Sequence, residues 1–131
     1  MSDSERATNS SGGGIVFGGS RSDPGSGDVA RGLRRRWASG VAVATAVEPN
    51  GGLRGVTVSS LMHVALDPPS LAIALATESS FHALLPEGAE FAISILDRRQ
   101  EFTAERFAGR APVPDARFGG VPHDLVGGLP I

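Results

Sequence analysis

The chain has 131 residues, 40% of them hydrophobic, and a formal net charge of −2, which suits one domain with its own apolar core. It has no basic excess to indicate nucleic acid or an anionic membrane surface, and no cysteine for disulfides, thiolate catalysis or metal ligation. No apolar run approaches the roughly 20 residues of a membrane helix, and the Ser/Gly-rich start does not read as a secretory signal, so we expect a soluble, cytoplasmic protein.

The first 27 residues are polar and rich in serine and glycine. Such a segment buries too little apolar area to offset the entropy lost on ordering. We therefore expect a disordered tail over residues 1–27 and one ordered domain over residues 28–131.

The first predicted element is a helix from Asp28 to Trp37, with Asp28 as its N-cap. Val29, Leu33 and Trp37 recur every four residues and form one apolar stripe. The run of arginines at residues 34–36 lies mainly off that stripe. It is either a solvated basic face or a basic rim that attracts an anionic nucleotide.

An antiparallel hairpin is predicted next. Gly40 ends the helix, and Val41–Val47 alternates β-branched residues with alanine, a strand pattern with one small face. Glu48–Gly52 contains an Asn-Gly pair, which is a strong hairpin-turn signal. Leu53–Ser60 then returns as the second strand.

Two further strands are predicted beyond this hairpin. Paired prolines make Leu66–Ser70 a stiff loop. Leu71–Ala76 is a continuous apolar run, which predicts a strand buried on both faces. A short helix over Phe81–Leu85 follows the polar stretch Thr77–Ser80, and Phe91–Leu96 is the fourth strand.

The last predicted helix has the clearest boundaries. Asp97 and Gln100 have the spacing of a capping box, the helix runs to about Phe107, and Gly109 ends it. After Arg110 the chain is rich in proline and glycine and shows no obvious closing element. Antiparallel strands with helices only in the connections predict a small, mainly β barrel. Four strands do not close a barrel, so we expect an incomplete or dimeric one.

The second strand of the hairpin is the first candidate for binding chemistry. Val56, Val58 and Ser60 point to one face of it, whereas Thr57 and Ser59 point to the other. A flat heterocycle can lie across such a face of hydroxyls and small residues. The alternative is an ordinary edge strand with a polar outer face.

The second candidate is the hydroxyl-rich stretch before the short helix. Thr77, Ser79 and Ser80, with free amides at a helix N-terminus, would form a phosphate-sized anion site. The alternative is plain N-capping, and the charge of Glu78 opposes a phosphate.

Side-chain catalysis is not indicated by the sequence. The three histidines, His63, His82 and His123, lack the spacing of a metal site, so we expect no metal. No nucleophile elbow or phosphate-binding P-loop occurs either. This pattern fits a protein whose cofactor does the chemistry, with no catalytic side chain of its own.

Several segments, in the right order, resemble the flavin reductase-like domain family. They are Arg36–Ala46, Gly55–Leu61, Val64–Pro69, Ser79–Leu85 and Phe91–Leu96, followed by Gln100 and Arg106–Gly109. Each motif is weak by itself, whereas their common order and spacing over Leu33–Gly120 make the resemblance specific.

The resemblance implies an antiparallel Greek-key split β-barrel with short connecting helices, working as a homodimer. It implies a reductase that passes a hydride from NADH or NADPH to FMN or FAD. The reduced flavin then diffuses to a partner monooxygenase. By the same resemblance, Thr57, Val58, Ser59 and Ser60 hold the flavin ring and ribityl chain, and Ala74, Leu75 and Ala76 line its other side. Ser79, Ser80, Phe81 and His82 surround the phosphate, with Phe107 near the edge of the pocket.

Three departures from the family pattern qualify these expectations. The family often has arginine where this chain has Ser80, and a small hydroxyl residue where it has His63. The chain stops at Ile131, whereas the family continues into final strands with a Gly-Asp-His segment linked to nicotinamide binding. We therefore expect a partial domain with its C-terminal strands missing. The alternatives are a non-catalytic flavin-binding or dimerising module and an inactive fragment that does not fold alone.

Overall fold

The computed structural model describes residues 26–111 and 118–131. The chain divides into two units, Met1–Ala38 and Ser39–Ile131, and each is described by itself. The expected disordered tail lies outside the described residues except for its last two, which are helical. The domain boundary at residue 28 stays a prediction.

The first unit contributes the helix α1 (Ser26–Arg36). The predicted helix is confirmed, but it begins before Asp28, so the expected N-cap role of that residue is wrong. Asp28 instead lies in the first turn, where its carboxylate pairs with the Arg31 guanidinium on an exposed surface. The arginines at residues 34–36 are also exposed, as expected of a solvated basic face.

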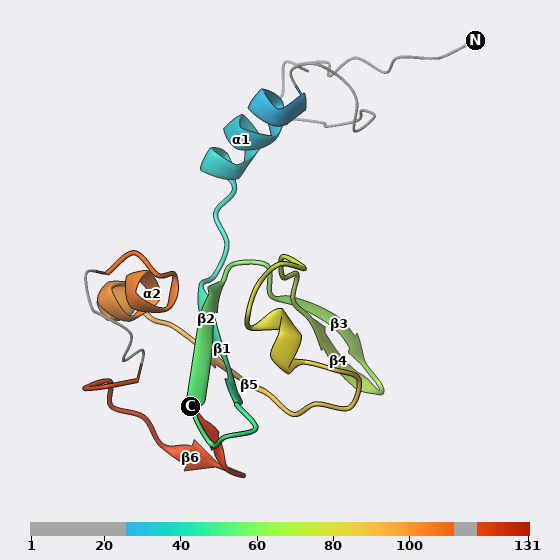
Figure 1. The fold of residues 1–131 in the computed structure, drawn as a ribbon. Helices are drawn as coiled ribbons and strands as arrows, with labels where there is room; N and C mark the ends of the chain where they lie inside the picture. Colours follow the sequence, from blue (N-terminus) through green and yellow to red (C-terminus); the bar gives the residue numbers. More distant parts are fainter. Residues whose placement is uncertain (1–25, 112–117) are drawn as a thin grey trace. The chain divides into compact units, whose positions relative to one another are not determined.

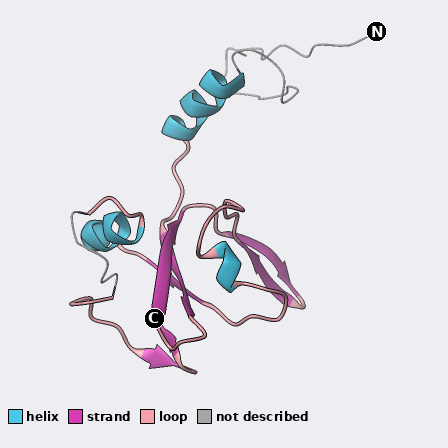
Figure 2. Cartoon of the chain, viewed as in Figure 1, coloured by secondary structure: helices cyan, strands magenta, loops and turns pink. Residues whose placement is uncertain are grey.

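The second unit is built on a three-stranded antiparallel sheet (Figures 1 and 2). Strand β1 (Ala42–Val47) lies between β2 (Leu53–Val58) and β5 (Ala92–Ile95). Ala44 pairs with Val56 on one side and with Ile93 on the other, which fixes the register of all three strands. The predicted hairpin and fourth strand are therefore confirmed.

The β1–β2 turn follows the sequence signal. The Gly52 amide donates to the Asn50 side-chain oxygen at 2.8 Å, and Gly51 adopts a φ of 85°, in the left-handed region that favours glycine. Across the turn, Arg54 Nε donates to Glu48 Oε1 at 2.6 Å in a half-buried ion pair. These contacts hold the two strands in register.

The two faces of β1 pack against different partners. Ala44 and Ala46 contact Phe81, which lies beside the short 3-10 helix η1 (His82–Leu84). The other face of the sheet is covered by α2 (Glu101–Phe107), the helix that follows β5. The first five residues of β1 are buried as a result, because both of its faces are covered.

The segment after β2 differs from the expectation. It forms a second hairpin, in which β3 (Met62–Leu66) pairs with β4 (Pro69–Ala72). Most of the loop expected over residues 66–70 is therefore the turn of this hairpin and the start of β4. The expected strand Leu71–Ala76 stops at Ala72, and it is not buried on both faces. The hairpin is a separate two-stranded sheet, and most of its side chains are exposed. Its exposed apolar side chains are Met62, Val64, Leu66 and Leu71.

The capping box before α2 is confirmed. Asp97 accepts a hydrogen bond from the Arg99 amide at 2.7 Å, and Gln100 Oε1 accepts one from the Asp97 amide at 2.8 Å. They start a 3-10 turn, η2 (Arg98–Gln100), that continues into α2. Gly109, with a φ of 75°, follows the helix end as predicted.

The charge of Asp97 should make this cap sensitive to pH. Hydrogen bonds from the Arg99 side chain, and then from its backbone amide, hold the pKa of the Asp97 carboxyl below its ordinary value. A lowered folded-state pKa stabilises the fold above the unfolded-state pKa of about 4, and this contribution is lost as the pH falls through the folded-state value. In thermal melts from pH 7 to pH 3, Asp97→Asn should keep the cap but lose this part of the pH dependence. An Asn variant with the wild-type pH profile would contradict the assignment.

The C-terminal residues contain a closing element that the sequence did not reveal. Strands β6 (Leu125–Val126) and β7 (Leu129–Pro130) pair across two glycines of positive φ. Pro130 is buried, and its carbonyl accepts a hydrogen bond from the buried Thr45 hydroxyl of β1 at 2.5 Å. The described fold is therefore mainly β, with few and short helices, as expected. No helix among its residues has the length and apolarity needed to cross a membrane.

Candidate functional site

Two of the predicted flavin-contacting segments lie side by side in the structure. Ser60 follows the end of β2, Ala74 follows the end of β4, and their polar groups are directly bonded. Ser59, Ala74 and Ala76 are exposed, so small side chains line this part of the surface. The sequence expectation concerned the Thr57 and Ser59 face of the strand, and at Thr57 that face is covered by α2.

The predicted phosphate site is less regular than expected. The helix after it is a single 3-10 turn of three residues, too short for an appreciable dipole. The Ser79 amide donates to the Ala76 carbonyl at 3.0 Å, and the Phe81 amide donates to Ser79 Oγ at 3.2 Å. These two amides are therefore not available to an anion. Ser80 and His82 are exposed at this turn.

Three of the twelve predicted contact residues are buried in the protein core. Val58, Phe81 and Phe107 are 5%, 3% and 4% exposed. Leu75 is half-buried and packs against the cluster formed by Ala44, Ala46 and Phe81. Leu75 and Phe81 pack together beneath the exposed surface, whereas Phe107 packs against Gly55. The ligand contacts expected of these four residues stay predictions.

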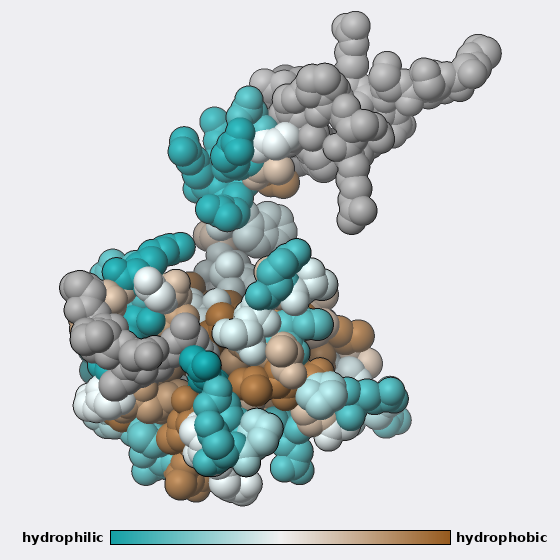
Figure 3. All heavy atoms as spheres, in the orientation of Figure 1, coloured by the Kyte–Doolittle hydropathy of each residue, from teal (hydrophilic) through white to brown (hydrophobic). Residues whose placement is uncertain are grey.

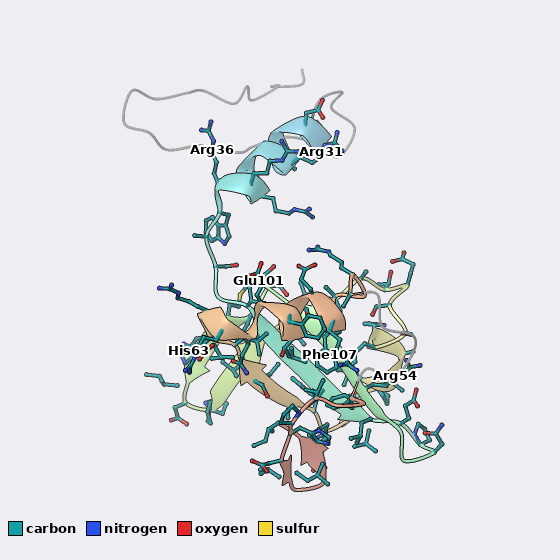
Figure 4. All side chains as sticks on the ribbon, turned by 90° about the vertical axis from the view of Figure 1, so that its left-hand side faces the viewer. Arg31, Arg36, Arg54, His63, Glu101 and Phe107 are labelled. Atoms are coloured by element: carbon teal, nitrogen blue, oxygen red, sulfur yellow. The ribbon has the colours of Figure 1, made fainter. Side chains whose placement is uncertain are left out.

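Thr57 and Phe107 belong to the opposite face of the sheet. The Thr57 hydroxyl donates to the Ala104 carbonyl of α2 at 2.6 Å. The Phe107 ring lies so close to Gly55 that a Cβ there would be 2.8 Å from two ring carbons. Figure 4 shows Phe107 where α2 meets the sheet, with His63 away from it on β3. Thr57 and Phe107 therefore both hold α2 against β2.

A cavity of about 220 Å³ lies on this α2 face. Phe107 is the one residue of the predicted site among its described lining residues. The Phe118 ring packs on Phe107 with a centroid separation of 4.9 Å, and His123 packs edge-on against Phe118 at 5.2 Å. Sequence reasoning missed this cavity because the C-terminal hairpin that encloses it carries no recognisable signal. The other lining residues are Val43, Thr45, Ser94, Leu96, Gln100, Thr103, Val121, Pro122, Pro130 and Ile131.

The polar side chains of the exposed surface are hydroxyls, the imidazole of His82 and the carboxylate of Glu78. Within the parts of the chain that the structure describes, the Ser59 and Ser80 hydroxyls have no protein partner. Over residues 26–111 and 118–131, no cluster of three or more His, Asp or Glu side chains could hold a metal ion. The surface can therefore bind a ligand through hydroxyls and small apolar contacts.

Comparison with known proteins matches the resemblance seen in the sequence. Residues 34–131 match the family model described as the flavin reductase like domain. A flavin reductase (NADPH) of Lentzea aerocolonigenes is 39% identical over 103 residues, covering 76% of this chain and 58% of the relative. The chain spans about half the length of the curated relatives that it matches.

Solved structures give the same result. An NADH:FAD oxidoreductase of Streptomyces globisporus superimposes with a TM-score of 0.70 at 30% identity, covering 82% of this chain and 64% of that one. The styrene monooxygenase flavin reductase of Pseudomonas putida S12 gives 0.59 at 32% identity, covering 65% and 55%.

Proposed function

The chain belongs to the flavin reductase-like domain family, and from this premise we propose that it is part of an NADH- or NADPH-dependent reductase of FMN or FAD. The observation that carries the proposal is the family match over residues 34–131, which includes the whole sheet and the exposed small-residue surface. Two of the relatives named above are, by name, a flavin reductase (NADPH) and an NADH:FAD oxidoreductase.

The residues present fit a flavin on one surface. The exposed alanines Ala74 and Ala76 leave room for a planar ring. The Ser59 and Ser80 hydroxyls, which have no partner among the described residues, can donate to its polar atoms. His82 is exposed at the same turn as Ser80, and its imidazole can donate a hydrogen bond to a phosphate. A bound flavin supplies the hydride-accepting chemistry, so the protein has to bind and orient rather than provide a base.

We propose that the working assembly is a homodimeric Greek-key split barrel. Two observations support it. β2 and β5 are the edges of the three-stranded sheet among the described residues, and such edges favour further strand pairing. Apolar side chains 58–84% exposed also reach the surface on β3 and β4 (Figure 3), as is typical of an interaction surface. Light scattering over a range of protein concentrations tests the dimer.

The proposed partner is a flavin-dependent monooxygenase that receives reduced flavin by diffusion. One of the relatives named above is, by name, the flavin reductase of a styrene monooxygenase, which supports a partner of this class. We place the reaction in the cytoplasm.

Adding FMN and then NADH to the purified chain tests the function. We expect FMN fluorescence to be quenched on binding and the absorbance of NADH to fall with added FMN. Riboflavin, which lacks the phosphate, is the control for the contribution of the Ser79–His82 turn.

The two readouts separate the alternatives. Quenching without NADH oxidation, repeated with NADPH, would favour a non-catalytic flavin-binding module. Unchanged fluorescence of both FMN and FAD at saturating protein would overturn the proposal.

A further inference from the structure

Ser60 makes an unusual pair of contacts at the proposed flavin surface. Its hydroxyl accepts a hydrogen bond from the Ala74 amide at 2.9 Å and donates one to the Ala74 carbonyl at 3.0 Å. One side chain thus satisfies both backbone groups of a residue 14 positions away. Ser60 lies beyond the end of β2 at Val58, and Ala74 lies beyond the end of β4 at Ala72. The side chain therefore replaces the backbone hydrogen bonds that two paired strands would make here.

These contacts limit what else the Ser60 hydroxyl can do. A serine has one hydroxyl hydrogen, and here it is donated to the Ala74 carbonyl. The hydroxyl therefore has no hydrogen left to donate to a flavin carbonyl. Its neighbour Ser59 is exposed and has no such bond within the described chain.

The location of the contact gives it a consequence for binding. Ser60 and Ala74 close the base of the β3–β4 hairpin and join the two segments that carry the exposed small residues. The residue after Ala74, Leu75, packs onto the core cluster around Phe81. The Ser60 contacts therefore set how the 74–76 segment lies against the chain that leaves the end of β2.

From this geometry we propose that Ser60 is a positioning residue of the flavin site. It holds Ala74–Ala76 against the end of β2, and direct hydroxyl contact with the flavin falls to Ser59 and Ser80. The inference rests on the proposed function, and it replaces the direct contact that the family resemblance implies for Ser60.

The experiment compares Ser60→Ala, Ser60→Thr and the matched control Ser59→Ala in the full chain. Amide hydrogen exchange at Ala74 is measured without flavin, and the Kd for FMN is measured where all variants are folded. We expect Ser60→Ala to speed Ala74 exchange and to weaken FMN binding, each by about three- to tenfold. Ser60→Thr, which keeps the hydroxyl, should restore both values.

The control separates positioning from direct contact. Ser59→Ala should weaken FMN binding while Ala74 exchange stays at the wild-type rate. If Ser60→Ala weakens FMN binding with Ala74 exchange unchanged, or speeds exchange with the Kd unchanged, the positioning role is overturned and the proposed function stands. If the wild-type chain binds no flavin, the proposed function and the positioning role fail together.

Discussion

Replacing Phe107 by alanine should lower the free energy of unfolding by about 3–5 kcal/mol, the usual range for a buried phenylalanine. The side chain is 4% exposed and packs between α2 and β2. Its ring also packs against Phe118 in a tilted arrangement, with the planes inclined at 59°. Urea unfolding followed by circular dichroism measures the loss. The more conservative Phe107→Leu should lose less, since it leaves a smaller cavity.

A substitution at Gly55 tests whether the Phe107 ring packs directly on β2. A Cβ at this position would be 2.8 Å from two carbons of the Phe107 ring and 3.3 Å from Val43 Cγ1. Gly55→Ala should therefore cost about 1–3 kcal/mol in the wild type, as overpacking does. In the Phe107→Ala background most of that cost should vanish, because the ring is gone. Strictly additive losses in this double-mutant cycle would show that the two residues do not touch.

Replacing Phe81 by alanine should have an effect of similar size, again about 3–5 kcal/mol. Phe81 is 3% exposed and joins η1 to the alanines of β1. The sequence resemblance assigns it to the phosphate environment, whereas its burial assigns it to the core. We therefore expect the variant to lose stability. Below its melting temperature, any loss of FMN binding should be small and should come from the support that Phe81 gives to Leu75.

Two matched variants separate these roles for Phe81. Phe81→Leu should recover much of the stability because it refills most of the volume. His82→Ala, at the next position but exposed, should leave the melting temperature nearly unchanged. A Phe81→Ala variant with wild-type stability and weakened FMN binding would contradict the core assignment.

Elements with local signals could be predicted from the sequence. The Glu48–Gly52 turn and the Asp97–Gln100 capping box depend on hydrogen bonds between residues at most four positions apart. Gly109 depends only on its own backbone angle. The β3–β4 hairpin was not predicted, because its paired prolines signalled a loop and its apolar residues signalled burial. Their exposure depends on what the rest of the fold leaves uncovered.

The candidate site was predicted as one group of twelve residues, and the structure divides it. Ser60 and Ala74 come together, whereas Thr57 and Phe107 lie on the face covered by α2. Alternation along a strand separates Thr57 from Val58, but it does not say which face a helix will cover.

The sequence by itself determined the family, the central hairpin and the ends of α2, because ordered motifs, turn residues and caps act over short stretches of chain. Tertiary structure decided which predicted contact residues are core and which are surface. The contacts that decide it join residues 14, 47 and 85 positions apart, between Ser60 and Ala74, Thr57 and Ala104, and Thr45 and Pro130. No local pattern encodes such contacts, since each depends on how separate elements pack.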